Sequence, residues 1–476
     1  MFETGVRQLR MALSMLRGKA IDPRNVERLV GDALATLAMF GSPGDDALEL
    51  VAGPMADPQS RRALQEQALR RTARRLAAVS PFYRAHFSSL GLDLKQLTLE
   101  QMSEIPVTTK RDLVERAAEF LADGSRPLIA TRTTGTTGRP VEVWLSRYEL
   151  DLWSAFGALG GVLRDELRPS DCIQINMSSR ATATVQLTVS AYRLVGARTR
   201  VLGVVPVEDS IDSLLDGGDA APTLLSAYPS YLAQLVREAR RRALGPDDFH
   251  LRRIDCGGEV LSPSLVRAAT ETFGAEVGDV FGMTEVLPVR ARVCEHGHLH
   301  HDVTMGFTEV VNLDSGSPCA PGEVGSLVIT PYYPYRECMP VFRHDTRDLV
   351  RSLPEGELTC SLAAMPATST VLGKAGHVLS IDGRIITPRE LVEVLESLPG
   401  QPWPARFSAT ALADHLRIEL SRDTAGELSP ADLQRHIASR TGGVPVVCRV
   451  VDGDAALGLR RLRADLIEHT FTRQEA

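Results

Sequence analysis

The sequence predicts an α/β fold, with a large N-terminal body of mixed sheets flanked by helices and a small α+β domain at the C-terminus. Between about residues 127 and 350, short β-rich runs alternate with amphipathic helical stretches, as is typical of α/β architecture. A passage rich in Pro and Gly then precedes a unit in which strands and helices alternate again. We therefore expect a helical extension over 1–60, the main body over 61–373 and a lid domain over 377–476, with a hinge at about 374–376.

Composition and charge exclude several classes of protein. The chain has 476 residues, of which 43% are apolar and 24% charged, and its net charge is −7. A dedicated nucleic-acid binder would show a strong basic face, and no apolar run approaches the roughly 20 residues that span a bilayer. Seven cysteines without a regular framework indicate a reducing compartment. We expect a cytoplasmic protein with no membrane span and no nucleic-acid partner, whose oligomeric state stays open.

The first part of the chain is expected to be mostly helical. Residues 2–16 carry one apolar stripe at helical spacing, which predicts an amphipathic helix that packs on the body; a membrane or partner contact is the alternative. The segment 60–87 predicts a second amphipathic helix that stops near Pro81.

The loop TRTTGTTGRP, residues 131–140, lies between two expected strands. Glycine lets the backbone approach a ligand closely, and successive N–H groups in a tight turn suit an anion. The Walker pattern is absent because Gly138 precedes Arg139 and Pro140. The loop therefore predicts a phosphate site of another kind, and a hairpin that binds nothing is the alternative.

Four later segments follow this loop in order: CGGEVLSPSL, DVFGMTE, VFRHDTRDLV and LGKAGHVLSIDGRIITPREL. Together they resemble the adenylate-forming superfamily of acyl-CoA synthetases, peptide-synthetase adenylation domains and luciferases. The resemblance is to its phenylacetate–CoA ligase-like branch, whose pattern runs SSGTTGKP, a Gly-Glu turn, YGxTE, RYRTRD and GRxDD. The segments SPFYRAHF and IPVTTKRDL also resemble that branch, so the similarity covers roughly residues 65–476.

The resemblance implies a nucleotide site. It places the loop residues around the β- and γ-phosphates of ATP, two glycines and a carboxylate along adenine and the acyl pocket, Phe281 on the adenine ring, Asp348 on the ribose hydroxyls and Lys374 beside them. The implied cofactor-binding residues are Thr133, Thr134, Gly135, Thr136, Thr137, Gly138, Gly257, Gly258, Glu259, Phe281, Gly282, Met283, Asp348 and Lys374. Alone, Asp348 could equally be a turn residue.

The implied catalytic residues are Thr284, at the α-phosphate, and Glu285, which would hold Mg²⁺; Glu285 alone could instead cap a helix. The branch also places a lysine near the C-terminus, where this chain has Arg460 and Arg461 and no lysine. An ammonium and a guanidinium are not equivalent, so an arginine does this work, the step is supported differently, or it is lost. Gly376 stands where the branch has its hinge aspartate.

The implied reaction is activation of a small, aromatic carboxylic acid by ATP as an acyl-adenylate, with release of pyrophosphate and transfer to coenzyme A. The resemblance places the acid near Trp153, Phe156 and Tyr228, although Trp153 and Phe156 could equally be core. One alternative is another acceptor or a non-carboxylate acid such as nitrite. Another is a catalytically impaired nucleotide-binding relative. The sequence names neither the acid nor the pathway.

A metal site is the last expectation. The segment CEHGHLHH packs several donors together, and the resemblance implies a structural zinc in this region, as in some relatives of the branch. A tetrahedral zinc site from Cys256, Cys294, His300 and Cys338 is chemically reasonable. Because no CxxC pair supports it, buried free thiols beside a histidine-rich hairpin are the alternative.

Overall fold

The structure is a computed structural model that describes most of the chain. It covers residues 20–41, 57–133, 140–178, 182–218, 220–354, 356–400, 403–453, 457, 460–461, 467–468 and 470–473. The helix expected over 2–16 lies outside these residues, and so do Thr134, Gly135, Thr136, Thr137 and Gly138. No helix among the described residues is long and apolar enough to cross a membrane.

The N-terminal part is helical, as expected. A helix begins at proline after an aspartate cap in two cases, Asp22 before α2 and Asp57 before α4, because Pro at the first helical position has no N–H to leave unpaired. The amphipathic helix expected to stop near Pro81 is confirmed as α4, which ends at Val79, and Ser80 then caps α5. The elements are α2 (Pro23–Phe40), α4 (Pro58–Val79), α5 (Pro81–Ser88), η1 (Glu100–Glu104), α6 (Lys110–Glu115) and α7 (Ala117–Phe120).

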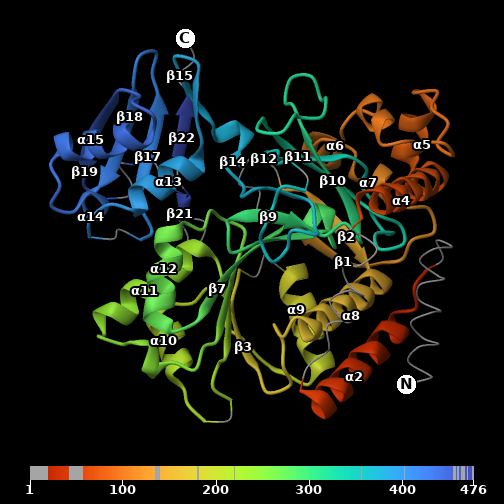
Figure 1. Ribbon diagram of the computed structural model, residues 1–476, viewed down its shortest axis with the longest axis horizontal. Coiled ribbons are helices and arrows are strands. Elements are labelled where there is room, and N and C mark those ends of the chain that lie inside the picture. Colours follow the sequence, from red (N-terminus) through yellow and green to blue (C-terminus); the bar gives the residue numbers. More distant parts are fainter. Residues whose placement is uncertain are drawn as a thin grey trace.

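A mixed sheet forms the centre of the body (Figure 1). Its described strands number eight. Neighbours in the run β4, β3, β5, β6 and β7 pair in parallel, and β8, β9 and β13 continue the sheet with antiparallel pairs. In spatial order they are β13 (Ala367–Ser369), β9 (His298–His301), β8 (Arg290–Val293), β7 (Glu276–Gly282), β6 (Arg253–Cys256), β5 (Leu224–Ala227), β3 (Cys172–Asn176) and β4 (Arg198–Val201).

Helices cover both faces of this sheet. Ile173 and Ile175 of β3 pack with α8 and α9 in one apolar cluster, whereas Leu225 of β5 and Ile254 of β6 pack with α10, α11 and α12 in another. The alternation of side chains along each strand supplies an apolar surface to each layer. These helices are α8 (Arg147–Leu163), α9 (Thr182–Val195), α10 (Val207–Leu215), α11 (Pro229–Arg241) and α12 (Pro263–Phe273).

Two further sheets complete the body. The Thr- and Gly-rich loop joins an antiparallel pair, β1 (Pro127–Arg132) and β2 (Glu142–Ser146). A four-stranded sheet has the order β10 (Gly306–Val311), β11 (Val324–Pro331), β12 (His344–Arg351) and β14 (Gly373–Lys374). Short 3₁₀ turns are η2 (Pro246–Asp248), η3 (Thr284–Val286) and η4 (Ala375–His377).

The C-terminal part has its own apolar core, built from residues between Leu379 and Phe471. Its sheet has the order β19 (Val446–Val451), β18 (Leu416–Ser421), β17 (Phe407–Ala411) and β22 (Thr470–Arg473). The other elements are β15 (Leu379–Ile381), β16 (Arg384–Ile386), α13 (Pro388–Glu396), α14 (Arg422–Ala425), α15 (Pro430–Arg440), β20 (Arg460–Arg461) and β21 (Ile467–Glu468). The expected α/β fold class with a small α+β C-terminal region is confirmed, and the expected domain boundaries remain a prediction.

Candidate active site

Glu285 lies in η3, directly after β7 ends at Gly282. The buried side chains of Val286 and Leu287 anchor this turn in the core of the body. Glu285 itself is only 3% exposed. Burial raises the pKa of its carboxyl, while the charges of Lys374 and Lys110 lower it. A buried carboxylate of this kind is stabilised by a cation at its oxygens.

Asp348 and Lys374 form an ion pair beside Glu285. They face each other on the antiparallel strands β12 and β14, and Lys374 Nζ lies 2.8 Å from Asp348 Oδ2. The same ammonium donates to the carbonyl oxygen of Thr346 at 3.1 Å, and the Asp348 carboxylate is buried. The pair leaves one carboxylate oxygen of Asp348 without a bond to the ammonium, so this side chain can still accept from a ligand hydroxyl.

Lys110 joins this group from the helical N-terminal part. Thr108 donates its N–H to the carbonyl of Arg343 at 2.8 Å and accepts from the N–H of Asp345 at 2.9 Å, which fixes the start of α6 against β12. Desolvation lowers the pKa of Lys110, while the charge of Glu285 raises it and that of Lys374 lowers it. The sequence alone does not assign Lys110 to the site. Two features of the sequence point to this residue: its position in IPVTTKRDL, and the presence of only four lysines in the chain.

Two glycines after β6 allow close packing at the carboxyl ends of the strands. A Cβ on Gly257 would lie 2.5 Å from the carbonyl oxygen of Val280. Gly258 has a φ of +83°, and a Cβ there would lie 3.4 Å from Tyr228 Cε1. The turn therefore requires glycine at both positions. The next residue is Glu259, and its carboxylate accepts a hydrogen bond from the backbone N–H of Ser230 at 2.8 Å. Ser230 lies in the first turn of α11, so this bond occupies one carboxylate oxygen of Glu259.

The residues expected around adenine and the acid come from three elements. Phe281, Gly282 and Met283 follow one another at the end of β7, and Phe281 and Met283 are half-buried against the body core. On α8, the ring N–H of Trp153 donates to the carbonyl of Tyr335 at 2.7 Å, and Trp153 is buried in the core of the body. Phe156 is half-buried, with its ring centroid 5.8 Å from that of Tyr335.

Four expected site residues remain: Thr133, Thr284, Arg460 and Arg461. Thr133 closes the β1–β2 pair, because it exchanges backbone and side-chain hydrogen bonds with Val141 at 3.0 Å. Thr284 lies half-buried in η3. The backbones of Arg460 and Arg461 form β20, paired with β21, but their side chains fall outside the described part.

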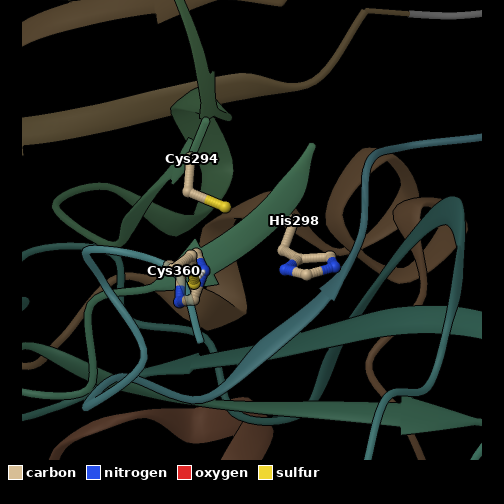
Figure 2. Close-up of side chains that lie close together, drawn as sticks. Cys294, His298 and Cys360 are labelled. Carbon is tan, nitrogen blue, oxygen red and sulfur yellow. Dashed lines mark hydrogen bonds between the residues drawn. The ribbon is translucent and has the colours of Figure 1, made fainter. Parts of the chain in front are cut away.

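A second group of side chains gathers where β8 turns into β9. Cys294, His298, His300 and Cys360 each offer a ligand atom, and these atoms all lie within 4.8 Å of one another; Figure 2 shows three of them side by side. His298 and His300 are two residues apart on β9, so their side chains lie on the same face of the sheet. His300 Nε2 lies 3.2 Å from Cys360 Sγ, and His300 Nδ1 lies 3.2 Å from the carbonyl of Met365.

The residues of this group fit a tetrahedral zinc ion. The ring Nδ1 of His298 is buried without a hydrogen-bond partner in the described chain. The carbonyl of Met365 would hold His300 with Nε2 free for a metal, as a backbone acceptor does in many metal sites. Burial and the neighbouring Cys294 raise the pKa of Cys360, and a cation would reverse that effect.

The expected zinc ligands are corrected in two positions. Cys294 and His300 belong to the group, but Cys256 and Cys338 do not, and His298 and Cys360 take their places. Cys256 is buried at the end of β6, within the apolar cluster of α10 to α12. The backbone N–H of Cys338 donates to Glu149 Oε1 at 3.0 Å. Neither cysteine is on the hairpin that carries the histidines.

The chain is similar in sequence to known proteins. The family model described as AMP-binding enzyme matches residues 62–333. A phenylacetate–coenzyme A ligase of Thermus thermophilus is 27% identical over 387 residues, which covers 79% of this chain and 81% of that protein. The phenylacetate–coenzyme A ligase of Escherichia coli is 26% identical, covering 76% and 79%.

Solved structures share the fold. The structure of 2-hydroxyisobutyryl-CoA ligase in the postadenylation state with 2-HIB-AMP aligns with a TM-score of 0.72 at 20% identity, covering 84% of this chain and 87% of that one. The same ligase in the thioesterification state, with 2-HIB-AMP and CoA, aligns with a TM-score of 0.60 over 88% and 91%.

Proposed function

Because the chain belongs to the AMP-binding enzyme family, we propose that it activates a small, aromatic carboxylic acid with ATP and transfers the acyl group to coenzyme A. The observation that carries this proposal is that four charged side chains meet: Glu285 just after β7, Asp348 on β12, Lys374 on β14 and Lys110 at the start of α6. Two carboxylates and two ammonium groups in one partly buried place suit a nucleotide with its metal ion.

The reaction has two halves. In the first, the substrate carboxylate attacks the α-phosphorus of ATP, the bond to the bridging oxygen breaks, and pyrophosphate leaves. In the second, the thiolate of coenzyme A attacks the acyl carbon and AMP leaves. Asp348 would accept from the ribose hydroxyls, and Phe281 would lie against adenine. Thr284 would donate to the α-phosphate, as an oxyanion donor does in other acyl-transfer enzymes.

A magnesium ion would supply charge neutralisation at the phosphates, and the buried carboxylate of Glu285 would hold it. In this proposal Lys110 and Lys374 supply the fixed positive charge at the site. Arg460 and Arg461 are the other candidates for the role that a C-terminal lysine has in the family. Zinc at Cys294, His298, His300 and Cys360 would be structural, since four protein ligands leave no open position.

The aromatic acid is supported by the phenylacetate–coenzyme A ligases among the relatives and by the aromatic contact of Phe156 with Tyr335 near the expected acid site. The higher TM-score with the postadenylation-state structure supports an arrangement of the two parts suited to the first half-reaction. We infer that the C-terminal part then turns about the residues near Gly376 to admit coenzyme A.

The test is acid-dependent ATP–pyrophosphate exchange over aryl, short-chain and inorganic acids, with and without coenzyme A. We expect exchange with an aryl acid, and consumption of coenzyme A when it is present. The variants Arg460→Ala and Arg461→Ala show whether an arginine replaces the lysine. Exchange without consumption of coenzyme A would point to another acceptor. No exchange with any acid, despite measurable ATP binding, would contradict the proposal and indicate a catalytically impaired relative.

A further inference from the structure

Arginine side chains line the face of the large sheet that α8 and α9 cover. Arg290 is paired with Gly282 and Arg292 with Val280, so both side chains point to one side of the sheet. Desolvation lowers the pKa of Arg290, and the positive charges of Arg292 and of Arg164, at the C-terminal end of α8, both lower it further. The three guanidinium groups therefore lie near one another, between β8 and α8.

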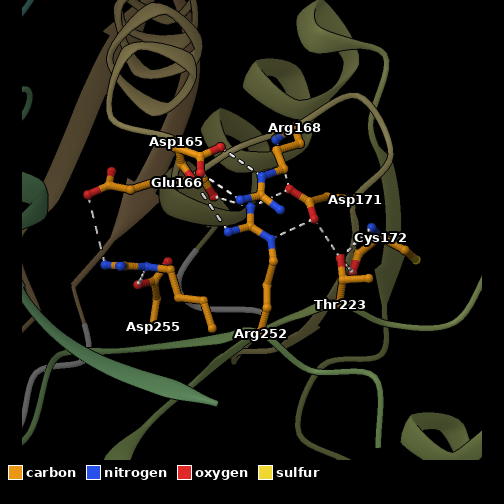
Figure 3. Close-up of polar contacts among 9 residues, drawn as sticks. Asp165, Glu166, Arg168, Asp171, Cys172, Thr223, Arg252 and Asp255 are labelled. Atoms are coloured by element: carbon orange, nitrogen blue, oxygen red, sulfur yellow. Dashed lines mark hydrogen bonds and ion pairs between the residues drawn. The ribbon is translucent and has the colours of Figure 1, made fainter. Parts of the chain in front are cut away.

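Carboxylates pair with most of the arginines on this side of the body. Arg164 lies 3.0 Å from Glu166, and Arg292 also pairs with Glu166. Further along the sheet, Arg253 pairs with Asp255, and Arg252 holds both oxygens of Asp171; Figure 3 shows this part of the network. Such pairs satisfy the guanidinium groups and fix α8 to the sheet.

Arg290 has no such partner. Within the described residues its guanidinium makes no hydrogen bond and no ion pair, although Asp255 and Asp302 act on it through their charges. Its side chain is exposed, and yet desolvation lowers its pKa more than any other cause. Arg290 Cγ lies beside Gly282, since a Cβ on that glycine would be 4.0 Å away. Positive charge therefore remains available beside the end of β7.

Arg290 lies at the strand end that leads into the expected active site. It is paired with Gly282, and Met283, Thr284 and Glu285 follow Gly282 directly. Across from it, Phe156, Gly160 and Arg164 are spaced by four residues and so share one face of α8.

Phe156 adds an aromatic ring to this face of α8. The guanidinium of Arg164 lies over Gly160, since a Cβ there would be 2.9 Å from Arg164 Nη1. The ring of Phe156, one turn earlier, packs edge-on against Tyr335. Arg164 on α8 and Arg292 on β8 both pair with Glu166, which holds this face of α8 against the strand that carries Arg290.

We propose that Arg290 binds a second carboxylate on the substrate acid, so that the enzyme prefers an aromatic dicarboxylate to an aromatic monocarboxylate. One carboxylate would be activated at Thr284 and Glu285, the ring would lie against Phe156, and the distal carboxylate would reach Arg290. A guanidinium without a protein partner is suited to bidentate recognition of a carboxylate. This inference rests on the proposed function, because it names the acid that the same site activates.

The experiment compares acids that differ only in the distal group: the carboxyphenylacetates, the matching carbamoylphenylacetates and phenylacetate. Exchange of pyrophosphate into ATP is measured for wild type, Arg290→Gln, Arg290→Lys and Arg435→Gln. Arg435 is an exposed arginine on α15 paired with Asp432, so its variant controls for loss of one positive charge. We expect wild type to prefer a carboxyphenylacetate over its amide by about tenfold or more in kcat/KM.

In Arg290→Gln the ratio of kcat/KM for the carboxyphenylacetate to that for its amide should fall to about one or below. Exchange with phenylacetate should stay within about threefold of wild type. Arg290→Lys should restore part of the preference for the carboxyphenylacetate, and Arg435→Gln should keep all of it. A wild type that prefers the amides, or an unchanged preference in Arg290→Gln, would overturn the inference. If no acid supports exchange, the proposed function fails, and calorimetric binding of the carboxyphenylacetates decides the inference separately. Binding that is lost in Arg290→Gln supports it, and equal or absent binding overturns it.

Discussion

Individual residues at the candidate active site owe their behaviour to neighbours that lie far away in the sequence. Glu285 is a buried carboxylate whose charge is supported by Lys374 and Lys110, and Lys374 is in turn held by Asp348. The motif spacing predicted that Glu285, Asp348 and Lys374 share a function. It could not predict Lys110, because only the contact between Thr108 and β12 brings α6 to the site.

Replacing Lys110 by methionine tests its role. Lys110→Met should lower kcat/KM for ATP in the exchange reaction by about 100-fold, since it removes a positive charge near the leaving phosphates. Lys95→Met is the matched control, because Lys95 is exposed in a turn and its loss should leave exchange unchanged. Equal rates in the two variants would show that Lys110 does not serve the nucleotide.

At the scale of elements, the β8–β9 hairpin decides which donors can share a metal. The alternation along β9 puts His298 and His300 on one face, while His301 points to the other and contacts Thr368 at 3.1 Å. Sequence proximity alone could therefore find Cys294 and His300. It could not find Cys360, which reaches the hairpin from the segment between β12 and β13.

Cys360→Ser is the variant that tests the metal group. The wild-type protein should carry about one zinc ion per chain, and the variant should lose most of it and melt at a lower temperature, because a structural zinc site contributes to folding free energy. Metal content is measured by mass spectrometry beside Cys319→Ser, a free cysteine outside the group. A metal-free wild type, or equal zinc in both variants, would contradict the assignment.

At the scale of the whole molecule, the C-terminal part is held to the body by contacts around α12. Ser262 donates to the buried carboxylate of Glu396, Trp403 donates to Ser264 at 3.0 Å, and Arg389 donates to the carbonyl of Leu261 at 3.2 Å. Apolar periodicity predicted both parts separately. It could not predict this interface, because Trp403 packs into the apolar cluster of the body and Val260 against that of the C-terminal part, and no local pattern marks either residue or the polar groups around them.

Glu396 should make this interface depend on pH. Burial raises the pKa of its carboxyl from 4.5 to about 7. Between these values the folded protein holds a proton that the unfolded chain has released, so the stability contributed by Glu396 falls as pH rises through this window. Glu396→Gln should flatten that part of the melting-temperature profile between pH 5 and 8, while Glu427→Gln, at an exposed position, should not. An unchanged slope in Glu396→Gln would exclude this group as the cause.

The central claim is that one site binds the acyl-adenylate of an aromatic acid. Its most direct test is calorimetric titration with the phenylacetyl sulfamate of adenosine, a stable analogue of that intermediate, which should bind more tightly than ATP or the free acid. We predict tight binding to wild type and about 100-fold weaker binding to Asp348→Asn, because the variant loses a charged acceptor for the ribose. No binding to wild type, or equal affinity for the variant, would contradict the account.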